Sequence, residues 1–119
     1  PEEPLLLAYD QQGKPHTQEL VDVRDIVQGL LLIHDKPEAI GETFNLAPAT
    51  PVSLAEFIPY LAKATGRRYV EAKIPVELAR THGSAAKARA LLGYEPRYSL
   101  FDMVDEAVAA QRAQQKAAA

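Results

Sequence analysis

Hydrophobic and polar positions follow two different periods along the chain, and the first clear pattern is helical. Apolar residues recur at the spacing of one helix face over Val23, Ile26, Val27, Leu30 and Leu31. Asp22 stands where it can cap the first turn, and Asp25 lies where the helix dipole favours negative charge. We therefore predict a helix that begins after Asp22, carries this apolar face and ends before Pro37.

A second unit of pattern combines a strand, a short loop and a helix. Thr43 to Leu46 is predicted to be a buried strand, and the helix after it runs from Leu54 to about Thr65. Ser53 and Glu56 form a capping box, in which the Ser53 hydroxyl accepts a hydrogen bond from the Glu56 amide. This helix start is the best-specified local feature of the chain.

Extended segments are predicted on both sides of these helices. The runs 5–9 and 16–21 flank turn-forming residues and predict a β-hairpin. Residues 69–74 alternate between apolar and polar side chains, which predicts a half-buried strand. Pro75 opens a possible single helical turn over residues 75–80.

Two more helices complete the predicted fold. Ser84 caps a helix from Ala85 to Leu92, and the last helix begins near Leu100 and frays into the Gln/Ala tail. The expected fold class is α/β (α+β), with short strands and about four helices in a single domain, residues 1–119.

Composition places the chain among ordinary globular proteins, with 47% hydrophobic and 24% charged residues. The net charge of -3 and the lack of a concentrated basic face argue against nucleic-acid binding. There is no cysteine and no apolar run long enough to span a membrane, so we expect a cytoplasmic protein without a membrane partner.

Residues suited to catalysis or metal binding are few. His16, His34 and His82 lack the spacing of a metal pair, and the glycines form neither a dinucleotide fingerprint nor a P-loop. Tyr69 and Lys73 have the Tyr-x-x-x-Lys spacing of a dehydrogenase pair, but that chemistry needs a helix and the alternation here predicts a strand. We expect no catalytic residue, no cofactor-binding residue and no metal ligand in this chain.

Five motifs, in order, resemble the C-terminal part of the extended short-chain dehydrogenase/reductases, the NAD(P)-dependent nucleotide-sugar epimerases and dehydratases. They are Val21-Asp22-Val23-Arg24-Asp25-Ile26-Val27-Gln28-Gly29-Leu30, Gly41-Glu42-Thr43-Phe44-Asn45-Leu46, Pro51-Val52-Ser53-Leu54-Ala55-Glu56-Phe57, Lys87-Ala88-Arg89-Ala90-Leu91-Leu92-Gly93-Tyr94-Glu95-Pro96 and Tyr98-Ser99-Leu100. Together they cover about the last hundred residues of the chain.

The resemblance implies a small C-terminal substrate-binding lobe that lacks the Rossmann half of the enzyme. In that family the Rossmann half carries the glycine-rich NAD loop and the catalytic Tyr-x-x-x-Lys pair. The complete protein would then transfer hydride at a sugar carbon with NAD or NADP, whereas this piece alone would bind no cofactor and be inactive.

The same resemblance gives candidate substrate-binding residues. Gln18 stands where many members have an Arg directed at the diphosphate, and Arg80 is the counterpart of an Arg that reaches the nucleotide. Arg24 and His82 are further polar groups that can contact an anionic ligand. The candidate site residues are Gln18, Arg80 and His82, and the resemblance implies a nucleotide-sugar as the substrate, with another small metabolite as the alternative.

Two functional hypotheses remain open. The chain is either the substrate-binding lobe of such an enzyme or a free-standing α/β interaction domain derived from that lobe. In both cases a surface that normally packs on the Rossmann half is left apolar, so we expect a homo-oligomer.

Overall fold

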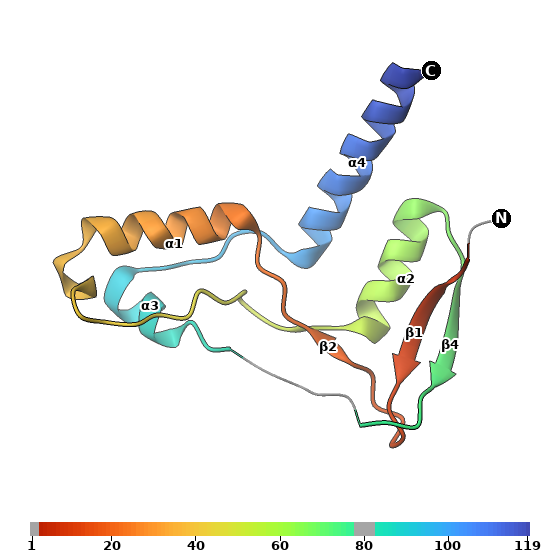
Figure 1. Ribbon diagram of the computed structural model, residues 1–119, viewed down its shortest axis with the longest axis horizontal. Helices are drawn as coiled ribbons and strands as arrows, with labels where there is room; N and C mark the ends of the chain where they lie inside the picture. Colours follow the sequence, from red (N-terminus) through yellow and green to blue (C-terminus); the bar gives the residue numbers. More distant parts are fainter. Residues whose placement is uncertain (1–2, 78–82) are drawn as a thin grey trace. The chain divides into compact units, whose positions relative to one another are not determined.

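A computed structural model of the protein describes residues 3–77 and 83–119, and it divides the chain into two compact units. The first unit comprises Pro1–Gln18, Val52–Arg80 and Phe101–Ala119, and the second comprises Glu19–Pro51 and Thr81–Leu100. The described residues form four α-helices, one short 3-10 helix and short strands, which confirms the expected α/β class (Figure 1).

The first unit contains a parallel pair of strands. β1 (Leu5–Tyr9) pairs with β4 (Tyr69–Lys73), with Leu5 opposite Tyr69 and Tyr9 opposite Lys73. Figure 1 shows the red β1 and the green β4 side by side. Helix α2 (Leu54–Thr65) packs on this pair, and Leu7 of β1 is only 1% exposed.

The predicted β-hairpin is wrong. Asp10 does form a tight turn, since its carboxylate accepts hydrogen bonds from the Gln12 and Lys14 amides at 3.0 and 2.9 Å. However, the chain that leaves the turn does not pair with β1 beyond an isolated bridge between Tyr9 and Pro15. β1 instead pairs with a strand about 60 residues away in the sequence, a partner that local turn chemistry cannot reveal.

Helix α2 begins and ends as its sequence indicates. β2 (Thr17–Gln18) pairs antiparallel with β3 (Val52–Ser53), directly before the helix. The Ser53 hydroxyl accepts a hydrogen bond from the Ala55 amide at 3.2 Å, so Ser53 caps the helix through a different amide from the expected Glu56. Gly66 ends it in the left-handed conformation, with φ 72°.

Helix α4 (Leu100–Ala118) is held against α2 by three contacts. The Tyr60 and Phe101 rings meet edge to face at 4.8 Å, and the Tyr60 hydroxyl donates to Asp105 at 2.6 Å. Arg112 donates to the Ala64 carbonyl at 2.8 Å. The helix continues to Ala118 rather than fraying at the start of the Gln/Ala tail.

The second unit is built from α1 (Val23–Asp35), the 3-10 helix η1 (Pro37–Ala39) and α3 (Ala86–Leu92). Its buried core consists of four alanines, one leucine and one tyrosine: Ala39, Ala47, Ala85, Ala88, Leu92 and Tyr94. The Gln28 carboxamide donates to the Glu95 carbonyl at 2.8 Å and accepts from the Glu95 amide at 2.9 Å. These bonds tie α1 to the chain after α3.

Helix α3 starts one residue later than expected. The Ser84 hydroxyl accepts from the Ala86 amide at 3.2 Å, and the helix runs from Ala86 to Leu92. Gly93 ends it with φ 70°. The turn predicted over residues 75–80 is a bend at Pro75 and Val76, and its remainder lies outside the described residues.

Most of the apolar face predicted for α1 is exposed in the described chain. Val23, Val27, Leu30 and Leu31 are 71%, 49%, 56% and 58% exposed. The buried positions of the helix are Asp25 and Gly29, and Ile26 is half-buried. Helical spacing identifies residues that share a face, but it does not say which face the rest of the described chain covers.

The strand predicted over Thr43 to Leu46 has no partner among the described residues. Phe44 and Leu46 are half-buried while Thr43 and Asn45 are exposed, which is the alternation of a strand. No backbone group of residues 43–47 makes a hydrogen bond within residues 3–77 and 83–119. The segment therefore has the side-chain pattern of a strand but none of the backbone hydrogen bonds that would join it to a neighbouring strand in the described chain.

Within residues 3–77 and 83–119, no helix combines the length and apolar character needed to cross a membrane.

Candidate functional site

A cavity of about 540 Å³ opens in the second unit. Its lining comes from the chain before α1, from α1 itself, from the extended segment and from the start of the chain that leads to α3: Glu19, Val21, Ile26, Phe44, Asn45, Leu46, Ala47, Pro48 and Gly83. Most of these side chains are apolar, and Glu19 and Asn45 are the polar ones. Such a composition suits a binding surface with a few orienting polar groups.

Glu19 closes one side of this cavity. Its carboxylate oxygens Oε2 and Oε1 accept hydrogen bonds from the Gly83 amide at 3.0 and 3.3 Å. Gly83 follows His82 directly in the sequence. Glu19 therefore fixes the point at which the described chain resumes after residues 78–82.

The extended segment forms another wall and is anchored at its side chains. The Lys87 ammonium lies 2.5 Å from the Glu42 carboxylate and 5.2 Å from the centre of the Phe44 ring. A Cβ at Gly29 would lie 2.5 Å from Cδ1 of Leu46, so the glycine provides the space that this leucine occupies. The absence of a side chain at Gly29 therefore serves the packing of α1 against Leu46.

The start of α1 is fixed by its own charges. Asp22 caps the helix through the Arg24 amide at 2.8 Å and also accepts from the Arg24 guanidinium, with Nη2 2.8 Å from Oδ2. The guanidinium lies 3.6 Å from the centre of the Tyr98 ring. The hydrogen bond from the Arg24 side chain lowers the pKa of Asp22 to about 2. Arg24, a candidate for contact with an anionic ligand, thus has partners within the protein.

Asp25 is buried for a structural reason as well. It is 1% exposed, and its carboxylate accepts from the Arg97 amide at 2.8 Å and from the Tyr98 amide at 3.1 Å. This carboxylate holds the chain that leads toward α4. Its hydrogen bonds satisfy a group that would otherwise be costly to bury.

The predicted site residues are not brought together by the described part of the chain. Gln18 lies in β2 opposite Val52, in the first unit, and does not line the cavity. Arg80 and His82 lie outside the described residues. The role assigned to these three residues therefore stays a prediction.

Glu19 and Asn45 line the cavity but were not predicted from the sequence as site residues. Both are polar residues next to apolar neighbours in extended segments, Glu19 before Leu20 and Asn45 between Phe44 and Leu46. A polar residue embedded in an apolar strand pattern was the available signal. It marks a polar position but not the cavity, because the cavity is formed by segments far apart in the sequence.

Chemically, the cavity offers binding rather than an acid–base pair. Within residues 3–77 and 83–119, no three His, Asp or Glu side chains gather closely enough to hold a metal ion. Tyr69 and Lys73 stand at opposite ends of β4, so their backbones are separated by roughly 13 Å. The catalytic interpretation of this Tyr-x-x-x-Lys spacing is excluded, as the alternating pattern indicated.

Comparison with known proteins connects this architecture to a group of enzymes. No family model matches the chain. An uncharacterised UDP-glucose epimerase of Bacillus subtilis, YtcB, is 29% identical over 111 residues, which cover 91% of this chain and 34% of that protein.

Solved structures give the same result. A short-chain dehydrogenase/reductase superfamily protein of Agrobacterium tumefaciens, with bound NAD, is 35% identical with a TM-score of 0.85, over 92% of this chain and 34% of that one. The epimerase Mth375 of Methanothermobacter thermautotrophicus is 30% identical with a TM-score of 0.71, over 87% of this chain and 31% of that one. The chain spans about a third of the length of these relatives. The resemblance indicated by the sequence motifs, to the C-terminal part of the extended short-chain dehydrogenase/reductases of the NAD-dependent epimerase kind, is confirmed.

Proposed function

We propose that the chain is the substrate-binding lobe of an NAD(P)-dependent nucleotide-sugar epimerase or dehydratase. Residues 1–119 form a single C-terminal piece of that longer protein. The observation that carries the proposal is the similarity to the NAD-bound Agrobacterium protein, 35% identical over 92% of this chain but only 34% of that one. The cofactor, NAD or NADP, then binds to the part of the protein outside these residues.

An exposed apolar stripe and an unpaired extended segment in the second unit support this proposal. Val23, Val27, Leu30 and Leu31 form an apolar stripe on α1 with exposures of 49–71%, and we call these four residues the α1 stripe. The backbone of residues 43–47 lacks hydrogen-bond partners within the described chain. An apolar stripe and an unpaired extended segment are features that a neighbouring sheet and its helices cover. The nucleotide-binding half of the longer protein is the proposed occupant.

The nucleotide-sugar is the proposed substrate, and Gln18, Arg80 and His82 are the proposed contacts. The relatives support this class, since one is described as a UDP-glucose epimerase. Hydride transfer at the sugar requires groups from the other half, so residues 1–119 alone are inactive. Gln18 is neutral and grips a diphosphate less strongly than an Arg would.

The α1 stripe favours a second candidate function, a free-standing interaction domain. In that case the stripe is covered by a second copy of the chain, and the same stripe makes the isolated chain a homo-oligomer. The two functions differ in what precedes Pro1 in the gene. A reading frame that encodes roughly one to two hundred further residues with a glycine-rich nucleotide-binding loop supports the enzyme. An initiator Met directly before Pro1 supports the interaction domain and contradicts the enzyme.

A further inference from the structure

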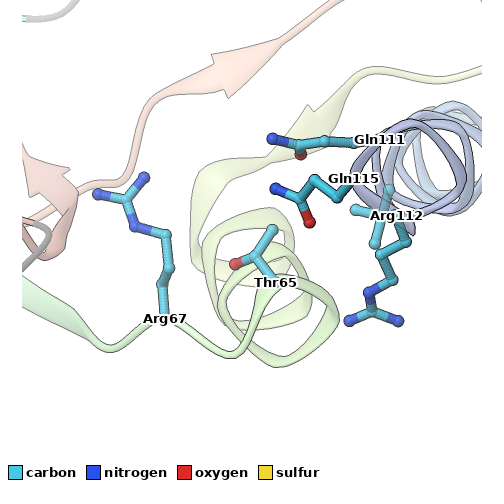
Figure 2. Close-up of a pocket in the computed structure, with 6 residues that line it drawn as sticks. Thr65, Arg67, Gln111, Arg112 and Gln115 are labelled. Atoms are coloured by element: carbon cyan, nitrogen blue, oxygen red, sulfur yellow. The ribbon is translucent and has the colours of Figure 1, made fainter. Parts of the chain in front are cut away.

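A second cavity, of about 230 Å³, lies in the first unit at the C-terminal end of α2. Its lining is mostly polar and comes from the end of α2, the residue after its glycine cap, and the C-terminal half of α4: Thr65, Arg67, Val108, Gln111, Arg112 and Gln115. Figure 2 shows these side chains. No carboxylate is among them.

The two walls of this cavity are fastened to each other. Arg112 of α4 donates to the Ala64 carbonyl at 2.8 Å. About two turns earlier on α4, Asp105 accepts from the Tyr60 hydroxyl at 2.6 Å. Gln111 and Gln115 are four residues apart and therefore share one face of α4. In Figure 2 both carboxamides extend from α4 toward the side on which Thr65 and Arg67 lie.

The polar groups of the cavity are mainly hydrogen-bond donors. Arg67 is half-buried, and its guanidinium donates to the Glu3 carbonyl, while a guanidinium carries five N–H groups and accepts nothing. Each Gln carboxamide adds two N–H donors. The Thr65 hydroxyl already donates to the Leu61 carbonyl at 2.7 Å, so it presents only its lone pairs to the cavity.

The surroundings add positive charge. Arg68 borders a neighbouring hollow together with Arg67, and Lys63 borders another together with Arg112. The carboxylates in those hollows belong to Glu3 and Asp105, and Asp105 is engaged by Tyr60. Arg67 and Arg112 therefore stand on the two walls of a cavity whose own lining includes no carboxylate.

We propose that this cavity binds a phosphate group, either the free ion or the phosphate of a monoester. A tetrahedral anion can accept hydrogen bonds from donors on two opposing walls, and a guanidinium can grip two of its oxygens at once. A planar carboxylate offers only two oxygens and cannot engage both walls equally well. Phosphate binding at this cavity is independent of the proposed epimerase function.

The test is a titration of the 119-residue chain with inorganic phosphate at constant ionic strength, followed by NMR. Saturable shifts of the Gln111 and Gln115 side-chain amides are expected, with acetate at least tenfold weaker. Parallel titration with glycerol phosphate identifies the source, since an ester that binds as well as the free ion indicates a monoester ligand. Binding of the free ion alone indicates inorganic phosphate.

Variants make the test specific. Gln115→Glu, at an exposed position of α4, places a negative charge on the wall and is expected to weaken phosphate binding at least tenfold. Arg112→Gln should do the same, and circular dichroism checks that α4 remains folded. Arg89→Gln removes the same charge from an exposed position of α3 in the second unit, and should change affinity less than twofold. Unsaturable shifts, equal binding of acetate, or an equal loss in Arg89→Gln would overturn the proposal.

Discussion

The α1 stripe makes a quantitative prediction about self-association. Burying a Val or Leu side chain completely stabilises by about 1.5–3 kcal/mol relative to leaving it exposed. The four residues are 49–71% exposed, so roughly half of that gain is still available to each, about 3–6 kcal/mol for the stripe.

Two copies that bury their stripes against each other would gain about 6–12 kcal/mol. Association costs about 4–15 kcal/mol in lost translational and rotational freedom. The two terms are of similar size, so the isolated chain should associate weakly and in a concentration-dependent manner. Sedimentation velocity across a range of concentrations measures this directly.

The double variant Val27→Lys/Leu31→Lys places two charges on the stripe, since these positions are four apart on α1. It should be monomeric at every concentration while its free energy of unfolding changes little, because both side chains are about half exposed. Leu91→Lys on α3, where the leucine is 40% exposed, is the matched control and should leave association unchanged. A wild-type chain that stays monomeric at high concentration, or a control that dissociates equally, would refute the reasoning.

Three further predictions concern stability. Because Arg24 lowers the pKa of Asp22 to about 2, below the about 3.9 of an unfolded Asp, the stabilisation by this carboxylate is present above about pH 4 and is lost as the pH falls toward 2. The free energy of unfolding of Asp22→Asn, measured with urea, should accordingly depend less on pH between about 4 and 2 than that of the wild type. An equal pH dependence would show that the Asp22 carboxylate does not supply this stabilisation. The Tyr94 hydroxyl is buried without a partner among the described residues, so Tyr94→Phe should raise the free energy of unfolding by about 1 kcal/mol, and a loss of that size would reveal a partner. Gly29→Ala gains about 1 kcal/mol of helix propensity but meets Leu46, so it should stabilise a Leu46→Ala background and not the wild type, with calorimetric melting as the readout.

Local chemistry predicted the helix starts, because a cap involves only neighbouring residues. Asp22 and Ser53 both cap the helices expected of them, and the strand of Tyr69–Lys73 is where the alternation placed it. Gly66 and Gly93, which end α2 and α3, adopt the left-handed conformation that glycine favours at a helix end.

Non-local pairing could not be predicted in the same way. The partner of β1 is β4, about 60 residues later, and no turn residue encodes that choice. The periodicity of α1 identified the residues of its stripe but could not say what covers them. The alternation of Thr43 to Leu46 is likewise real, but a ladder needs a second strand that the described chain does not supply. The cavity of the second unit escaped prediction because its lining combines segments from both sides of the α2 sequence.

If the chain is one lobe of an enzyme, as proposed above, its cofactor binds elsewhere in a longer protein. Calorimetric titration of NAD and NADP, into the isolated chain and into the product of the full reading frame, separates these two parts. We expect no heat of binding for residues 1–119 and stoichiometric binding of one of the two cofactors by the full product. Tight cofactor binding by the isolated chain, or none by the full product, would contradict it.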